Sequence, residues 1–401
     1  MRQKADIGDA TPQDAKNTTA VAPAQTSPGH QPPQKKRRKS PRAPKNRNAN
    51  RGADRKPSEP IYGALDLGTN NCRLLVARRV KSGFQIVDAF SRIVRLGEGL
   101  SNTGQLSDAA MDRTVDALKI CVGKMTRRGV TRVRAIATEA CRMAGNGGEF
   151  LDRVKAETGL ELDIVSTADE ARLAVAGCVP LLDRDCRSAL VFDIGGGSTE
   201  LIWVDIEGVH PPRILDWVSL SCGVVTLAER YGGKDVSEAV FEDMVRDVSA
   251  QLTAFAERRC AVTAEAAGGF QLMGTSGTVT TIAGIHLDLK RYDRAQVDGT
   301  WVTCEQVNDV TRKLLAMTYE ARAAHPCVGH GRADLVLAGC AILEAIRRAW
   351  PSERLRVADR GLREGILLSL ISADEAKSRR RRRRKAKKRT AAHTAPAPAG
   401  N

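Results

Sequence analysis

The residues that could do chemistry gather in two acidic, glycine-containing stretches, of which the second along the chain is the more distinctive. A short apolar run, 190–194, contains one acid and stops at three glycines. The residues that could contact a ligand here are Asp193, Gly195, Gly196, Gly197, Ser198, Thr199 and Glu200. Backbone N–H groups of glycines can close around an anion because no Cβ stands in the way. The stretch therefore predicts a phosphate-binding turn between two strands.

The two carboxylates of this stretch, Asp193 and Glu200, would repel a phosphate group. A divalent cation between the acids and the phosphate would remove that conflict, and the oxygen ligands present suit Mg²⁺. The pair therefore predicts a metal-assisted site.

An earlier stretch has the same design. An apolar run beginning at residue 61 contains Asp66, a polar turn follows, and Arg73 adds a cation. The residues of that turn are Gly68, Thr69, Asn70 and Asn71. Two such loops in one chain indicate two related lobes that face one ligand.

Strands and helices alternate around both loops, which is typical of α/β architecture. Strand–turn–strand patterns cover 61–94 and 188–205, and a helix is expected over 107–127. Another helix is expected to open near Thr167 with Glu170 in its first turn. The predicted parts are a disordered basic arm (1–60), lobe I (61–171), lobe II (172–372) and a disordered Arg/Lys-rich tail (373–401).

The formal net charge of +16 belongs to the two ends of the chain. Residues 1–60 carry a net charge of +9. Residues 377–401 contain eleven Lys and Arg, including Arg379 to Arg384, and no acid. The net charge that remains for 61–376 is −4. Basic blocks attract polyanions with an affinity that falls with salt. Polyphosphate, RNA and the ribosome are all compatible partners, and a merely solubilising role stays open. An aromatic content of 4% argues against a nucleic-acid stacking platform.

The ten cysteines include no Cys-x-x-Cys pair, so zinc-site spacing is absent and reduced core residues are expected. No apolar run reaches the roughly 18 residues of a membrane span, and no signal-peptide segment stands at the N-terminus. We expect a cytoplasmic protein that contacts no membrane. Its oligomeric state stays open, with a homodimer among the options.

Several further motifs make the chain resemble the Ppx/GppA family of exopolyphosphatases and guanosine pentaphosphate phosphohydrolases, within the actin/Hsp70/sugar-kinase superfamily. The matching stretches, in family order, are 64–74, 95–100, 137–146, 169–172, 193–200, 274–278 and 361–365. Two stretches depart from the family pattern: Asn71 stands where a serine is common, and Asp169 replaces the first of two glutamates. The chain also ends before the C-terminal helical domains of long members, which resembles the short, two-domain form and puts processive handling of long polyphosphate in doubt.

The resemblance implies two ribonuclease-H-like lobes flanking a cleft, and it assigns roles to residues. Asp66, Asp193 and Glu200 would hold Mg²⁺, directly or through waters. Glu170 would be the general base that activates the attacking water. Taken alone, Glu170 looks instead like a solvated acid in a helix first turn, where acids are favoured.

The arginines of the family motifs would bind phosphate oxygens through two N–H groups at once. They are Arg73, Arg95 and Arg142. Surface salt bridges are the common alternative for arginine, and that alternative stays open for all three.

The leading hypothesis is an Mg²⁺-dependent exopolyphosphatase, with inorganic polyphosphate as its substrate. Its rival within the family is a hydrolase of guanosine pentaphosphate (pppGpp). Two other classes remain, a small-molecule kinase of the wider superfamily and a non-catalytic polyanion or RNA binder that acts through its tails. The stretch at 169–172 favours attack by water over a kinase.

Overall fold

The computed structural model describes residues 59–81, 83–207, 212–265 and 269–393, except for the side chains of 259–265 and 385–393. The arm predicted over 1–60 lies outside the described residues apart from its last two positions. Within the described part of the chain, no helix is long and apolar enough to cross a membrane.

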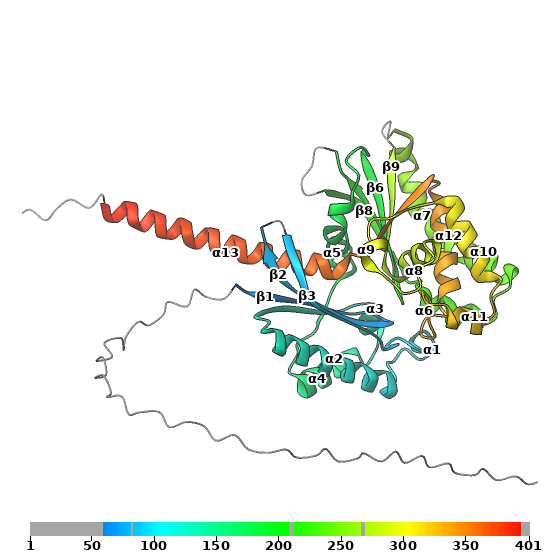
Figure 1. Ribbon diagram of the computed structural model, residues 1–401, viewed down its shortest axis with the longest axis horizontal. Coiled ribbons are helices and arrows are strands. Elements are labelled where there is room, and N and C mark those ends of the chain that lie inside the picture. The colour runs from blue at the N-terminus through cyan, green and yellow to red at the C-terminus, as the bar shows by residue number, and fades with distance from the viewer. Residues whose placement is uncertain (1–58, 82, 208–211, 266–268, 394–401) are drawn as a thin grey trace, which may run out of the picture. The chain divides into compact units, whose positions relative to one another are not determined.

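The chain builds two β-sheets (Figure 1). Their strands follow the same order, apart from one extra edge strand in the second sheet. The first sheet is ordered β3-β2-β1-β4-β5, with β1 (Ile61–Leu67), β2 (Asn71–Val80), β3 (Gly83–Ile93), β4 (Arg132–Ala137) and β5 (Asp163–Ile164). The second is ordered β10-β11-β9-β6-β7-β8, with β6 (Ser188–Ile194), β7 (Thr199–Asp205), β8 (Arg213–Leu220), β9 (Phe270–Thr275), β10 (Trp301–Thr303) and β11 (Arg354–Ala358).

In each sheet, three antiparallel strands are followed by two strands that run parallel to the first. β10 adds an antiparallel edge to the second sheet only. The predicted α/β class with two related lobes is therefore confirmed, and the repeated order is the one expected of ribonuclease-H-like lobes.

Helices complete the two lobes. Lobe I is the first sheet with α1 (Leu100–Thr103), α2 (Asp108–Arg128), α3 (Glu139–Met143) and α4 (Gly147–Thr158). Lobe II is the second sheet with α6 (Val224–Tyr231), α7 (Glu238–Glu265), α8 (Ser276–His286), α9 (Arg294–Val297), α10 (Cys304–Leu315), α11 (Tyr319–Ala324) and α12 (Val336–Ala349). The two remaining helices are α5 (Thr167–Cys178), followed by the 3₁₀ turn Val179–Leu181, and α13 (Leu362–His393).

The pattern of β2 shows why both faces of the first sheet are covered. Successive side chains of a strand point to opposite faces. Leu74 and Val76 enter a core with α2 and α4, whereas Leu75 and Ala77 enter a core with α13. Figure 1 shows α2 and α4 on one side of β1–β3 and α13 on the other. The apolar run 74–77 in the middle of β2 follows from this burial on both faces.

The helices α5 and α13 exchange lobes. α5 follows lobe I in sequence but packs on the second sheet, where Ala171 and Val175 join its core. α13 follows lobe II but packs on the first sheet through Ile366 and Leu367. The two helices also contact each other closely, since a Cβ on Gly365 would lie 1.9 Å from the carbonyl oxygen of Leu173. The prediction that placed the closing helix in lobe II did not anticipate this exchange.

The C-terminal segment also differs from its prediction as a disordered tail from residue 373. α13 is helical through His393. Its residues from 366 onward include no Gly or Pro and are rich in Ala, Lys and Arg, which are strong helix formers. The first three turns of α13 pack against the lobe I core, so the helix is already nucleated where its polar part begins.

Candidate active site

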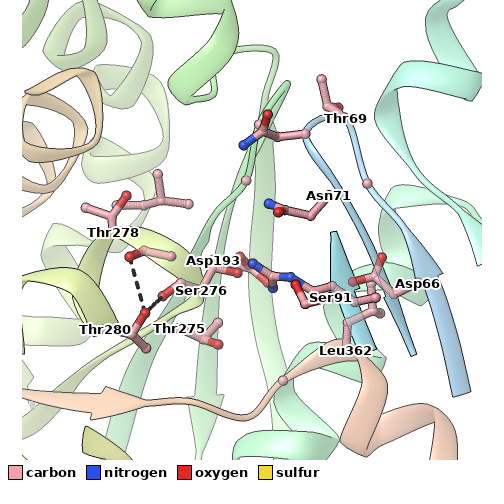
Figure 2. Close-up of a pocket in the computed structure, with 18 of the residues that line it drawn as sticks. Asp66, Thr69, Asn71, Ser91, Asp193, Thr275, Ser276, Thr278, Thr280 and Leu362 are labelled. Carbon is pink, nitrogen blue, oxygen red and sulfur yellow. Dashed lines mark hydrogen bonds between the residues drawn. The ribbon is translucent and has the colours of Figure 1, made fainter. Parts of the chain in front are cut away.

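A cavity of about 660 Å³ is lined by both lobes and by both glycine-containing loops. Most of the predicted site residues line it, namely Asp66, Gly68, Thr69, Asn70, Asn71, Arg73, Glu170, Asp193, Gly195, Gly196, Gly197, Ser198 and Glu200. Figure 2 shows Thr69 and Asn71 of lobe I opposite Thr278 and Thr280 of lobe II, with Asp193 between them. Sequence segments more than a hundred residues apart therefore meet at one site.

The strand pairs place the charged side chains of the two loops at equivalent positions. Asp66 near the end of β1 is paired with Arg73 of β2, and Asp193 near the end of β6 is paired with Glu200 of β7. Lobe I therefore presents an acid beside a base, and lobe II presents two acids. The facing strand pairs are therefore anionic in lobe II and mixed in lobe I.

The two loops touch because lobe II offers glycines where they meet. A Cβ on Gly196 would lie 2.9 Å from Cβ of Thr69, and one on Gly197 would lie 2.8 Å from Oγ1 of the same threonine. Within the described residues, the N–H groups of Thr69, Asn70, Gly196 and Gly197 have no hydrogen-bond acceptor. Buried N–H groups are rarely left without acceptors, and N–H groups in such turns are the donors that an anion would need.

The N-terminus of α6 fixes the direction of the lobe II loop. The N–H groups of Val224 and Val225 donate to the carbonyl oxygens of Gly195 and Gly196 at 3.0 and 2.8 Å. Because these carbonyls are turned toward α6, they do not compete with an anion for the N–H groups on the cavity side.

Glu170 stands in the first turn of α5, where Ser166 caps the helix by accepting from the N–H of Asp169. Its carboxylate lies 3.2 and 3.3 Å from the guanidinium of Arg142. Burial raises the pKa of Glu170 to about 9, and the carboxylates of Glu200 and Asp193 add to this while Arg142 opposes it. Glu170 is therefore held between a cluster of acids and one cation.

The other cavity acids are perturbed in the same direction. Burial and the nearby charge of Asp193 raise the pKa of Glu200 to about 7, although Ser198 and Ser219 oppose the shift. Burial also raises the pKa values of Asp66 and Asp193, and Arg73 opposes both shifts. No three His, Cys, Asp or Glu side chains of the described chain lie close enough together to hold a metal ion by themselves.

Arg95 and Arg142, two of the predicted phosphate-binding arginines, do not line the cavity. Arg142 bonds Glu139 at 2.6 and 2.9 Å as well as Glu170, so it positions an acid of the cavity. Arg95 instead forms a two-pronged ion pair with Asp334 of lobe II, at 2.8 and 2.9 Å. Arg95 thus joins the lobes.

Sequence reasoning missed several polar residues that line the cavity from lobe II and α13. They are Thr280, Thr281, Tyr292, Arg294, Arg332, Asp359, Arg360, Arg363 and Glu364, and they lie beside Thr275, Ser276 and Thr278 of the 274–278 motif, which also line it. Burial lowers the pKa values of Arg332 and Arg363. Among the residues the structure describes, Arg363 has no ion-pair or hydrogen-bond partner, and Arg332 bonds only Thr281, at 3.3 Å. Arg363 lies in the 361–365 motif, which was the available signal, whereas nothing in the sequence marked Arg332.

Comparison with known proteins places these features in a family. The model of the Ppx/GppA phosphatase family matches residues 75–373. A guanosine-5′-triphosphate,3′-diphosphate pyrophosphatase from Aeromonas salmonicida is 30% identical over 78% of this chain, which spans 60% of that protein's length. Exopolyphosphatase 2 of Mycobacterium tuberculosis is also 30% identical, over 77% of this chain and 97% of that protein. The crystal structure of the Aquifex aeolicus member of the Ppx/GppA family superposes with a TM-score of 0.65 at 28% identity, over 79% of this chain and 98% of that one.

Proposed function

The chain belongs to the Ppx/GppA phosphatase family, and we propose that it is an exopolyphosphatase, which removes the terminal phosphate of inorganic polyphosphate with a water activated by Glu170. The observation that carries the proposal is the meeting of both glycine-containing loops and Glu170 around one cavity. Hydrolysis of a phosphoanhydride needs an aligned water, N–H donors for the phosphate oxygens and a group that takes the proton.

The residues of the cavity can be assigned to these needs. The N–H groups of Thr69, Asn70, Gly196 and Gly197 would donate to the oxygens of the terminal phosphate, and Arg73 would add a positive charge. Glu170, in its carboxylate form, would take the proton of the water as the water oxygen bonds to phosphorus. A cation beside Glu200 and Asp193 would favour that form, because these two carboxylates add to burial in raising the pKa of Glu170. The bond from phosphorus to the bridging oxygen breaks, and the shortened chain leaves with that oxygen.

We propose Mg²⁺ as the cofactor of this site. Since no three ligating side chains of the described residues form a cage, the ion would be held by one or two of Asp66, Asp193 and Glu200 together with waters and substrate oxygens, which is its usual mode at phosphate sites. The donor set fits, because it consists of carboxylates whose pKa values are raised chiefly by burial, a cost that a bound cation would offset. When bound, the ion would neutralise charge on the phosphate oxygens.

The raised pKa values predict that the Mg²⁺-free protein loses thermal stability as the pH rises from about 5 to about 9. Glutamates have a pKa of about 4.3 in unfolded chains, whereas Glu200 and Glu170 are raised to about 7 and about 9. The folded state therefore binds more protons in this window, and the free energy of unfolding falls as the pH increases. Thermal melts across this range test the expectation, and Mg²⁺ should raise the Tm more at pH 8 than at pH 5. A variant carrying both Glu170→Gln and Glu200→Gln should show a flatter profile, and an equally steep one would contradict the assignment.

The rival substrate is guanosine pentaphosphate, which the names of the Aeromonas relatives favour. Polyphosphate is favoured by the exopolyphosphatase relative, which this chain spans almost completely. Phosphate release from purified protein, measured on both substrates at matched concentrations with Mg²⁺, should give the larger kcat/KM on polyphosphate. A larger kcat/KM on the nucleotide would select the rival, and no release from either substrate would remove the enzymatic proposal.

A further inference from the structure

Helix α13 connects the cavity to the arginine block at the far end of the chain. Its first three residues, Leu362, Arg363 and Glu364, line the cavity. At a rise of about 1.5 Å per residue, Arg379 lies about 24 Å and Arg384 about 32 Å further along the helix axis than Arg363. One continuous element therefore sets the separation between the reaction site and the block.

The helix is anchored firmly up to the block. Ile366, Leu367 and Ile371 are buried against the first sheet. Beyond them, Asp374 pairs with Arg132 at 3.3 Å, and Glu375 pairs with Arg79 at 2.7 Å. These ion pairs lie directly before the arginines, so the direction in which the block is presented is fixed by lobe I.

The block itself is a free cationic surface. All six side chains from Arg379 to Arg384 are exposed. In the described part of the chain, the one ion pair of the six joins Arg379 to Glu375 at 3.7 Å. Six successive residues at 3.6 per turn point to every side of a helix, so positive charge surrounds the axis. Like charges on neighbouring turns repel each other, and a polyanion lying along the helix would relieve that repulsion.

We propose that Arg379 to Arg384 form a remote anchor for long polyphosphate, binding the inner part of a chain whose terminal phosphate lies in the cavity. The inference rests on the proposed function and adds a second contact for the same substrate. Such a contact raises affinity only for chains long enough to reach both places, because the second binding event is then intramolecular.

Two observations favour polyphosphate over a nucleic acid at this anchor. The segment 362–393 contains no Phe, Trp or Tyr, so it lacks the aromatic rings on which single-stranded bases commonly stack. The residues between the two tails carry a net charge of −4, so the rest of the body adds no general attraction for a polyanion. Binding at the anchor then depends on the charge density of the ligand and on whether the ligand is long enough to extend from the cavity to the arginines. A polyphosphate chain meets both conditions.

The test compares two full-length variants that keep the helix. Changing all six arginines to glutamine removes the charge with little change in helix propensity, and changing all six to lysine keeps the charge. We expect the glutamine variant to raise the KM for long-chain polyphosphate at least about tenfold, since linked contacts contribute factors of about 10²–10⁴. Its kcat and its KM for tripolyphosphate should stay at the parent values, and the lysine variant should resemble the parent on both substrates.

A series of chain lengths sharpens the test. The difference between parent and glutamine variant should appear only above a threshold length, and the affinity of the parent for long chains should fall more steeply with salt. An unchanged KM for long chains overturns the inference, and so does an equal rise in the KM for tripolyphosphate, which would indicate a structural effect on the cavity. Loss of RNA binding with polyphosphate affinity unchanged overturns it in favour of a nucleic-acid contact.

Direct binding separates this inference from the proposed function. The affinity of parent and glutamine variant for long-chain polyphosphate can be measured without turnover, by titration in the absence of Mg²⁺. If neither protein hydrolyses polyphosphate but the variant binds it more weakly, the proposed function is wrong and the anchor stands. Equal affinities of parent and variant would overturn the anchor whatever the activity.

Discussion

Glu170→Gln is expected to lower the kcat for polyphosphate roughly 10²–10⁴-fold, which is the usual contribution of a general base. The change removes the ability to take a proton while it preserves the size of the side chain and its capacity to accept from Arg142. Binding of polyphosphate should weaken little, because a general base acts mainly in the transition state. Steady-state kinetics together with direct binding measurements distinguish the two effects.

The neighbouring residue provides a matched control. Asp169 stands on the same first turn of α5, but its side chain is exposed and pairs with Arg172 at 2.9 Å. Asp169→Asn should therefore leave kcat within about twofold of the parent, as is usual for an exposed salt bridge. If Glu170→Gln abolished binding instead, or if Asp169→Asn reduced turnover as much, Glu170 would not be the base.

Gly223→Ala is expected to lower kcat/KM about 100-fold, although this glycine does not line the cavity. A Cβ at position 223 would lie 2.4 Å from the carbonyl carbon and oxygen of Gly196 and 2.6 Å from the nitrogen of Gly197. These contacts are with backbone atoms, which cannot rotate away as a side chain can. The methyl group must therefore displace the loop whose N–H groups we propose to bind the terminal phosphate.

Gly148→Ala is the control for this prediction. Gly148 is exposed near the start of α4, and a Cβ there would meet no heavy atom within 4 Å. Alanine should be tolerated or slightly stabilising at that position, with activity unchanged. Thermal melts of both variants separate loss of fold from loss of loop geometry. Parent-like kcat/KM in Gly223→Ala would show that the loop can shift without cost and would weaken its assigned role.

The features that could be predicted from sequence are those that depend only on short, continuous stretches of the chain. Asp66 and Asp193 each stand near the end of a buried strand that is followed by a tight turn, and a local pattern of this kind determines strand, turn and acid together. The lobe architecture followed from repeating that pattern. Helix α2 could be recognised from the helical spacing of its apolar residues, and its Ser107 N-cap and Gly129 C-cap match common helix boundaries.

The features that could not be predicted depend on contacts between distant segments. Arg95 pairs with Asp334, 239 residues away, and no local pattern distinguishes that partner from a phosphate group. Arg332 and Arg363 enter the cavity because lobe II and α13 close around it. The charge content of 373–393 predicts disorder, but these residues are helical because they have high helix propensity and follow helical turns that pack on lobe I.

The exchange of α5 and α13 between the lobes has a consequence for biosynthesis. The first sheet leaves the ribosome early, yet one of its faces, including Tyr62, Ala64 and Ile136, is covered by a helix translated after all of lobe II. Throughout that interval the nascent chain presents an apolar surface, on which chaperones could act and through which it could aggregate. The same helix supplies Leu362, Arg363 and Glu364 to the cavity, so a chain that ended before α13 would have both an incomplete cavity and an exposed apolar sheet face.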